Sequence, residues 1–132
     1  MIQYEKVNGN FDLTGKAAIV VGGTGGIGEA TAQMYARKGA RVAIVDCKDN
    51  CPEVAAKIAE EFGVQVIGVK CDVTSQESVD AMMKAVLEAF GEINILAAMP
   101  GFVDLYRASD ISIATIEKHM SINAVPGMPG GC

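Results

Sequence analysis

The sequence predicts a single α/β domain in which helices cover both faces of a parallel sheet. Short aliphatic runs alternate with longer amphipathic segments from Lys16 onward, which is the pattern of βαβ units. The runs are nearly continuous in apolar residues, as strands are when both faces are covered. A length of 132 residues suits one domain and is too short for two. We expect one domain over 1–132, with 1–14 as a lead-in and 124–132 as a Gly/Pro-rich tail.

The periodicity gives four strands and four helices in alternation. The expected strands are 17–21, 42–45, 64–69 and 93–98, and the expected helices are 27–38, 52–62, 75–90 and 113–123. Residues 101–110 have the composition of a loop. Gly39, Gly63 and Gly91 follow the first three helices, where glycine commonly ends a helix. Thr74 and Glu77 have capping-box spacing, so both side chains are expected to bind backbone N–H groups at the start of the third helix.

The composition excludes several classes of partner. The net charge is −5 and aromatic residues make up 5% of the chain, which disfavours nucleic acid and anionic membrane surfaces. Half of the residues are hydrophobic, yet no apolar run approaches the ~20 residues of a membrane span. Without a signal segment at Met1–Lys6, we expect a soluble cytoplasmic protein with reduced cysteines.

A glycine-rich loop joins the first strand to the first helix. The run Gly22-Gly-Thr-Gly-Gly-Ile-Gly28 places bare backbone at a helix N-terminus, where unpaired N–H groups and the helix dipole favour a phosphate. A nucleotide triphosphatase loop is a poor match, because Glu29-Ala30 stands where Lys and Ser or Thr are needed. The spacing Gly23-x-Gly25-x-x-Gly28 satisfies the dinucleotide-binding fingerprint.

Asp46 closes the second strand at about the expected ~20-residue interval after the loop. Its carboxylate can accept hydrogen bonds from both ribose hydroxyls, whereas a 2′-phosphate there would meet like-charge repulsion. The residue therefore favours NAD(H) over NADP(H), although the nearby Lys48 argues in the other direction. The alternative is that Asp46 only caps the turn that follows it.

Several motifs together resemble the short-chain dehydrogenase/reductase family. The segment 11–28 resembles its first strand and its Thr-Gly-x-x-x-Gly-x-Gly loop, with Val21 in place of the usual Thr. Similar matches occur at 71–74, which resembles the end of strand three, at 90–96 before strand four, and at Ile122–Asn123. The resemblance covers nearly all of 10–124. It implies a three-layer, doubly wound Rossmann-type sheet, truncated after about four strands in the order 3-2-1-4.

The resemblance also implies which residues hold the dinucleotide. The cofactor-binding residues expected on this basis are Gly22, Thr24, Gly25, Gly26, Ile27, Gly28, Asp46, Cys47, Asp72, Val73, Ala98 and Gly101. Asn123 is the counterpart of the family's active-site Asn, and no metal site is expected. The implied reaction is the reversible NAD-linked oxidation of an alcohol to a ketone or aldehyde. In this family the C-terminal half largely sets substrate choice, so the substrate is not readable from the sequence.

Two departures from the family pattern bear on activity. Ala98-Met-Pro-Gly101 replaces the usual Asn-Asn-Ala-Gly after strand four. The family's Ser and Tyr-x-x-x-Lys lie beyond the last residue, and none of Tyr4, Tyr35 and Tyr106 is followed by Lys four positions on. Whether the chain is an enzyme is therefore open, and we expect cofactor binding without turnover.

Other interpretations stay open at this stage. A non-catalytic interaction module is the main alternative, with the exposed side of strand four covered by a second copy or by a complementing chain. A further one retains catalysis through Tyr106, Asn123 or a residue from another subunit. The thiols of Cys47, Cys51 and Cys71 either form a disulfide or metal site or are small buried apolar groups. We expect His119 at the surface or in a helix cap, and Met82, Met83 and Met120 in helix–sheet packing.

Overall fold

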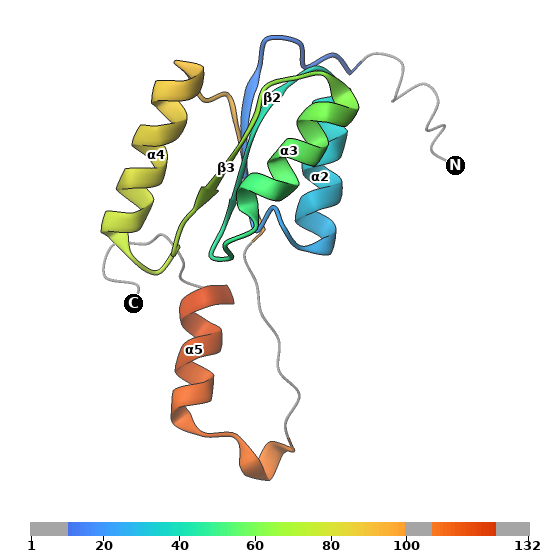
Figure 1. Ribbon diagram of the computed structural model, residues 1–132. Helices are drawn as coiled ribbons and strands as arrows, with labels where there is room; N and C mark the ends of the chain where they lie inside the picture. The colour runs from blue at the N-terminus through green and yellow to red at the C-terminus, as the bar shows by residue number, and fades with distance from the viewer. Residues whose placement is uncertain (1–10, 100–106, 124–132) are drawn as a thin grey trace.

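The computed structural model describes residues 11–99 and 107–123, which form a parallel sheet and its helices (Figure 1). The strands are β1 (Ala17–Val21), β2 (Arg41–Asp46), β3 (Val66–Lys70) and β4 (Ile95–Ala98), and their order is 3-2-1-4. The helices are α2 (Gly26–Arg37), α3 (Cys51–Phe62), α4 (Gln76–Phe90), the short 3₁₀ helix η1 (Ala108–Asp110) and α5 (Ile113–Asn123). The predicted fold class and strand order are confirmed.

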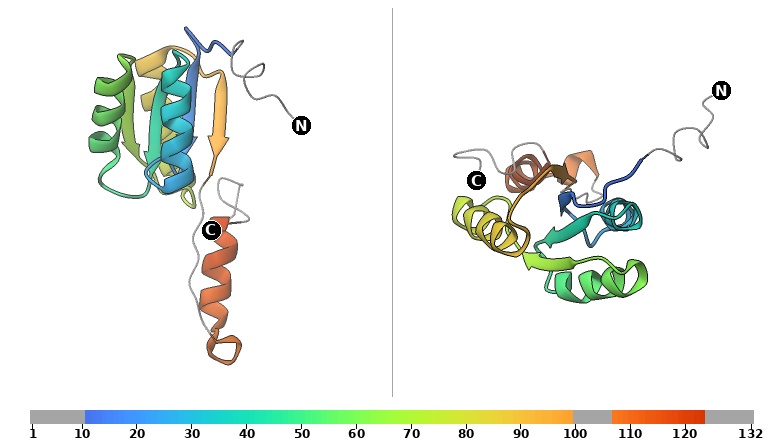
Figure 2. Two further views of the ribbon diagram at one scale, coloured as in Figure 1. Left: turned by 90° about the vertical axis from the view of Figure 1, so that its right-hand side faces the viewer. Right: turned by 90° about the horizontal axis from the view of Figure 1, so that it is seen from above.

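Three layers are visible when the sheet is seen along its edge (Figure 2). Helices α2 and α3 lie on one face of the sheet and α4 lies on the other, while α5 stands beyond the carboxyl ends of the strands (Figures 1 and 2). One core lies between the sheet and α2–α3 and includes Val20, Ile44 and Ile58. The second lies under α4 and includes Ile19 and Val86.

The strands differ in how far the helices cover them. Every residue of β1 is buried, as are the four central residues of β2, whereas β3 is only partly buried. In β4 partly buried and exposed residues alternate, and Leu96 is 64% exposed. The expectation that all four strands are covered on both faces is therefore wrong for β4, because α2, α3 and α4 pack mainly against β1, β2 and β3.

The ends of the helices agree with the sequence better than their beginnings do. Positive φ angles of 94°, 67° and 77° occur at Gly39, Gly63 and Gly91. Gly63 and Gly91 directly follow α3 and α4, and Gly39 lies two residues after the end of α2. The predicted capping box at the start of α4 is wrong. Ser75 is the N-cap and its side chain accepts the N–H of Ser78 at 3.3 Å. Thr74 instead donates its hydroxyl to Asp72 Oδ1 at 2.6 Å, because the aspartate forms a turn of its own there.

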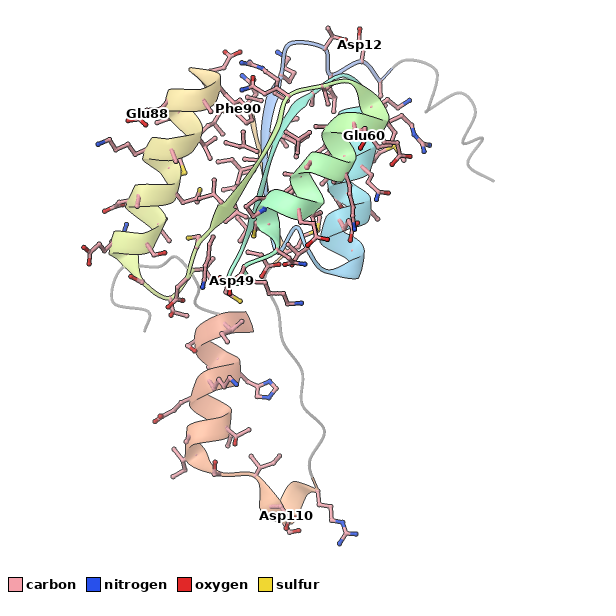
Figure 3. The ribbon with its side chains drawn as sticks, viewed as in Figure 1. Asp12, Asp49, Glu60, Glu88, Phe90 and Asp110 are labelled. Carbon is pink, nitrogen blue, oxygen red and sulfur yellow. The ribbon has the colours of Figure 1, made fainter. Side chains whose placement is uncertain are left out.

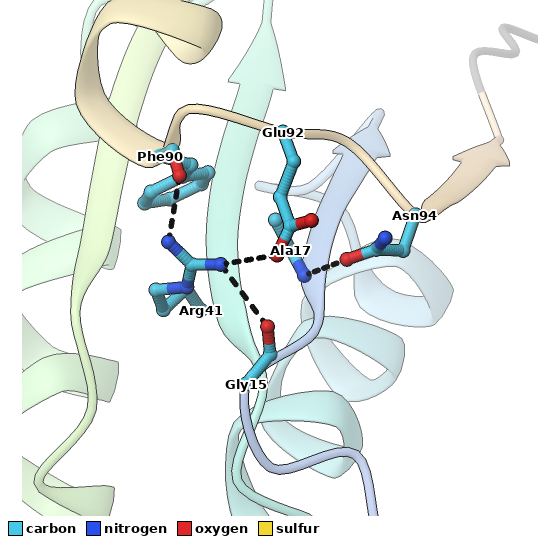
Figure 4. Close-up of polar contacts among 6 residues, drawn as sticks. All are labelled: Gly15, Ala17, Arg41, Phe90, Glu92 and Asn94. Carbon is cyan, nitrogen blue, oxygen red and sulfur yellow. Dashed lines mark hydrogen bonds and ion pairs between the residues drawn. The ribbon is translucent and has the colours of Figure 1, made fainter.

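At the amino ends of the strands, Arg41 ties three segments together (Figure 4). Its guanidinium donates to the carbonyl oxygens of Phe90 at 2.8 Å and Gly15 at 3.1 Å, and it pairs with Glu92 at 3.1 Å. The same group lies 5.5 Å from the centre of the Phe90 ring. Helix α4, β2 and the segment leading into β1 are therefore held at one point.

The start of β4 is fixed by the side chain of Asn94 (Figure 4). Its Oδ1 accepts the N–H of Ala17 at 2.8 Å, and its own backbone N–H donates to the Ala17 carbonyl at 2.8 Å. The strand begins at Ile95, two residues later than expected. A side chain takes the place of one strand–strand hydrogen bond at this point.

Helix α3 begins unusually close to β3. A Cβ atom built on Gly68 would lie 2.2 Å from the carbonyl carbon of Cys51, the first residue of α3. Only glycine allows the backbone of the helix to approach the strand this closely. The missing side chain at position 68 therefore sets the distance between α3 and the sheet.

Helix α5 exposes large apolar side chains that the other helices mostly bury in the core. Met82 is buried in the core under α4 and Met83 packs against it, as expected, but Met120 on α5 is 53% exposed, so that expectation is wrong. Ile113 and Ile116 of α5 are exposed as well. None of the helices described in 11–99 and 107–123 is long and apolar enough to cross a membrane.

Candidate functional site

A cavity of about 760 Å³ opens at the carboxyl ends of the strands. Its walls come from the loop after β1, the end of β2, the segment after β3 and the last turns of α5. The lining residues are Val21, Gly22, Gly25, Asp46, Cys47, Lys48, Cys71, Asp72, Val73, Thr74, Lys118, Ser121 and Ile122. This volume lies within the ~300–1,000 Å³ typical of small-molecule and cofactor sites.

The glycine loop has the geometry that close phosphate approach requires. Gly22 has a φ of 82°, and its N–H donates to the Val45 carbonyl at 2.7 Å. A Cβ on Gly28 would lie 2.0 Å from the Gly22 carbonyl oxygen, so helix α2 can start here only with glycine at that position. Apart from its chain neighbours and the backbone of α2 itself, no described heavy atom lies within 4 Å of the place a Cβ would take on Gly26. The loop is packed tightly on its inner side and open at Gly26.

The start of α2 presents backbone donors beside this opening that the helix itself leaves unpaired. The first helical hydrogen bond runs from the Glu29 N–H to the Gly25 carbonyl at 2.7 Å. The N–H groups of Gly26, Ile27 and Gly28 precede that bond and have no acceptor within the helix. Together with the positive end of the helix dipole they favour an anion.

Asp46 connects the end of β2 to the glycine loop. Its Oδ2 accepts the Thr24 hydroxyl at 2.6 Å and the Thr24 N–H at 3.3 Å, while Oδ1 accepts the Cys47 N–H at 2.8 Å. Partial burial alone would raise the pKa of this carboxyl, but the hydrogen bonds from Thr24 and Cys47 outweigh it and lower the pKa. Asp46 is therefore ionised at neutral pH, and it both bonds the following turn and lines the cavity.

A second carboxylate lines the cavity after β3. Asp72 Oδ1 accepts the hydroxyl of Thr74 at 2.6 Å and its N–H at 3.0 Å, and the Asp72 N–H donates to Ser78 Oγ at 2.9 Å. The bonds from Thr74 lower the pKa of Asp72. Val73 follows in the same wall, so the segment offers an acidic group next to an apolar one.

The three cysteines near the cavity are free thiols. Cys51 and Cys71 are buried, and Cys51 Sγ donates to the Lys48 carbonyl at 3.3 Å. Burial is the leading cause that raises the pKa of all three, and the charge of Asp46 adds to it for Cys47 and Cys51. Thiols with raised pKa values are poor nucleophiles and poor metal ligands. Within 11–99 and 107–123 no group of His, Cys, Asp or Glu is arranged to hold a metal ion.

Asp49 is a charged residue outside the cavity that can be compared with Asp46, which lines it. Asp49 pairs with Lys70 at 2.7 Å and is not part of the cavity wall. Figure 3 shows Asp49 at the end of the sheet that is next to α5, whereas Phe90 lies near the opposite end of the sheet. Asp49 is thus an exposed carboxylate only three residues from Asp46 in the sequence.

The cavity brings together six of the residues expected from the sequence: Gly22, Gly25, Asp46, Cys47, Asp72 and Val73. Thr24 holds Asp46, Gly28 is buried, Ile27 is 78% exposed, and Ala98 ends β4 outside the cavity wall. Asn123 is the last residue of α5, whereas Gly101 and Tyr106 lie outside the described residues.

Three cavity residues on α5 were not expected, namely Lys118, Ser121 and Ile122. They come close to the glycine loop only through the position of α5 relative to the sheet. No local spacing in the sequence signals such a contact.

The comparisons with known proteins show the family of the chain. The family model described as short chain dehydrogenase matches residues 16–128. The chain is 37% identical over 126 residues to D-threitol dehydrogenase of Mycolicibacterium smegmatis, covering 93% of this chain and 48% of that protein. It is 31% identical over 114 residues to NAD-dependent glycerol dehydrogenase of Listeria innocua, covering 86% and 44%. The chain therefore spans about half the length of these relatives.

Solved structures show the same fold. A short-chain type dehydrogenase/reductase from Mycobacterium marinum superposes with a TM-score of 0.83 at 31% identity, covering 90% of this chain and 48% of that one. L-sorbose reductase from Gluconobacter frateurii, in complex with NADPH and L-sorbose, gives a TM-score of 0.77 at 29% identity, covering 87% and 44%. With the family model matching most of its length, the chain belongs to the short-chain dehydrogenase family of oxidoreductases.

Proposed function

We propose that the cavity binds NAD(H) and that this chain is the cofactor-binding part of a short-chain dehydrogenase. The observation that carries the proposal is the pairing of the two expected elements. Asp46 is hydrogen-bonded to the glycine loop through Thr24 at 2.6 Å, and both the loop and Asp46 line one cavity. The proposed roles are pyrophosphate binding by the N–H groups at the start of α2, ribose binding by Asp46, and adenine contact by Asp72 and Val73.

The residues present fit a dinucleotide. The open space at Gly26 leaves room for a phosphate beside the unpaired donors, where a side chain would fill it. The segment after β3 supplies an apolar surface at Val73 for a base. Members of the family bind nicotinamide dinucleotides.

The preference for NAD(H) over NADP(H) rests on the ionised Asp46. A 2′-phosphate would bring two negative charges to a carboxylate whose pKa is already lowered. One relative is named an NAD-dependent glycerol dehydrogenase, while L-sorbose reductase was solved with NADPH, so both cofactors occur among related proteins. Lys48 and Lys118 also line the cavity, and the proposal is that Asp46 outweighs them.

The proposed reaction of the whole protein is hydride transfer between an alcohol and a nicotinamide dinucleotide, with the dinucleotide accepting or donating the hydride. We propose that residues 1–132 alone bind the cofactor without turnover. None of their tyrosines is followed by Lys four positions later, which is the arrangement that the family uses for proton transfer. The proposed setting is the cytoplasm, where thiols such as Cys47 remain reduced.

The test is a titration of the folded chain with NADH and with NADPH in the same buffer. The wild type should bind NADH more tightly. Asp46→Asn should weaken NADH about tenfold and narrow the difference from NADPH, since one charge-assisted hydrogen bond is worth about 1.5–3 kcal/mol. Asp49→Asn is the matched control, because it removes the same charge three residues away without touching the cavity. Tighter binding of NADPH by the wild type, or no binding of either nucleotide, would refute the proposal.

A second role is supported by the exposed side of β4. Within the described residues β4 pairs only with β1, and Leu96 projects into solvent at 64% exposure. We propose that a second copy or a complementing chain covers this side. Light scattering at high protein concentration should give a mass above that of one chain, and Leu96→Lys should lower that mass. A wild type that stays monomeric would contradict coverage of this side by a second copy and leave a complementing chain as its occupant.

A further inference from the structure

Hydrogen bonds from the protein fix the orientation of the Asp46 carboxylate toward a ligand. Three protein donors already point at its two carboxylate oxygens: the hydroxyl and N–H of Thr24 and the N–H of Cys47. A carboxylate offers about four lone-pair positions, so about one remains. Within the described residues the Cys47 thiol, a weak donor that also lines the cavity, interacts with Asp46 at this point, and a ligand hydroxyl can replace it. The donors from Thr24 converge on Oδ2 from the side of the glycine loop, and Asp46 lines the cavity.

The hydrogen of the Thr24 hydroxyl is already used in its bond to Asp46. At 2.6 Å this bond is short, as expected when the acceptor is charged. The hydroxyl therefore has no donor left for a phosphate oxygen, while it keeps the neighbouring carboxylate ionised and fixed. A ribose hydroxyl can still donate to Asp46, but a 2′-phosphate meets an acceptor without a compensating donor from Thr24.

We propose that Thr24 is a positioning residue that sets the discrimination between NADH and NADPH by holding the Asp46 carboxylate toward the cavity. The inference rests on the proposed function, because it concerns the same site. Thr24 acts through Asp46, whereas the backbone N–H groups at the start of α2 supply affinity for the pyrophosphate that the two nucleotides share.

The experiment compares Thr24→Val, which removes the hydroxyl at nearly constant shape, with Thr24→Ser, which keeps it. Thr31→Val is the matched control, since the Thr31 hydroxyl donates to the Ile27 carbonyl at 2.8 Å in the same helix and Thr31 is absent from the cavity wall. Nucleotide affinity is measured with NADH and NADPH. The pKa of Asp46 is measured in the ligand-free chain by carbon-13 NMR of its carboxyl group.

Thr24→Val should weaken NADH about fivefold and change NADPH less than about twofold, consistent with the loss of one hydrogen bond on a partly exposed group. It should also raise the pKa of Asp46, while Thr24→Ser and Thr31→Val leave both quantities near wild type. Lys48, Asp72 and Lys118 line the same cavity and are unchanged in every variant, so they do not account for a difference between valine and serine.

Equal weakening of both nucleotides by Thr24→Val would overturn the inference, because it would mean that Thr24 only shapes the loop. An unchanged pKa of Asp46 in Thr24→Val would overturn it as well. If the wild type binds neither nucleotide, the proposed function fails. In that case the measurement without ligand still decides whether Thr24 controls the carboxylate.

Discussion

The two ends of the sheet use polar side chains in opposite ways. At the amino ends, the donors of Arg41 and the Oδ1 of Asn94 bind groups of neighbouring segments (Figure 4), and neither residue lines the cavity at the carboxyl ends. At the carboxyl ends, Asp46 and Asp72 bind donors close to them and still line a cavity. The difference teaches that a parallel sheet can be fastened at one end and keep recognition groups at the other.

The largest expected effect comes from a substitution of Gly28, which should change both the stability of the fold and the binding of the nucleotide. Gly28→Ala places a Cβ 2.0 Å from the Gly22 carbonyl oxygen, so the backbone must move. We expect the free energy of unfolding to fall by about 3 kcal/mol, the upper range for overpacking, and nucleotide binding to be lost. Thermal and denaturant unfolding measure the first effect.

Gly26→Ala is the control for this change, because its Cβ meets no described atom within 4 Å apart from its chain neighbours and the backbone of its own helix. It should leave stability within about 0.5 kcal/mol of wild type, as surface substitutions usually do, and still weaken both nucleotides. Equal stability losses in the two variants would contradict the assigned geometry of the loop.

A smaller effect is expected at the amino ends. Arg41→Ala removes two hydrogen bonds to carbonyl oxygens and a partly exposed ion pair with Glu92. We expect a loss of about 1–2 kcal/mol in the free energy of unfolding, with NADH affinity unchanged at temperatures where the chain is folded. Lys57→Ala, which breaks only an exposed pair with Glu53, should change stability by less than about 0.5 kcal/mol. A loss of NADH affinity in folded Arg41→Ala would show that the two ends are coupled.

The smallest effect is the pH dependence contributed by Asp46. Its folded-state pKa is lower than its unfolded value of about 3.9, so its contribution to stability is present above that value and is lost as pH falls through the folded pKa. Unfolding between pH 2 and 6 should show a shallower acid decline for Asp46→Asn than for wild type. Parallel curves would mean that the Thr24 and Cys47 bonds do not stabilise the charged form.

Most of the fold follows from the sequence because its signals are local. Aliphatic runs, helical spacing and glycine stops predicted the strands, the helices and their ends, and the resemblance supplied the strand order. The capping box at Thr74 was wrong because the helix begins one residue later: Ser75 is the N-cap, and Thr74 is bonded to Asp72 in the turn before it. A spacing rule does not show which of two neighbouring hydroxyl residues becomes the N-cap.

Some residues of the candidate site could likewise be predicted from local signals in the sequence, and others could not. Gly22, Gly25 and Asp46 were predicted because their roles depend on residues nearby in the chain or on a known interval. Lys118, Ser121 and Ile122 could not be predicted, because they reach the cavity only through the placement of α5. The bond from Thr24 to Asp46 spans 22 residues and depends on how the loop closes over β2.

Gly68 lies outside the cavity wall, but a side chain at this position would move one wall of the cavity. The segment 47–50 joins β2 to α3, and the first residue of α3 rests on the backbone of β3, where a Cβ on Gly68 would come within 2.2 Å. Any side chain at this position would push the helix outward and pull on the short segment that begins beside Asp46. Position 68 thus acts as a spacer, through which the width of the cavity can change during evolution or design while every residue in its wall stays the same.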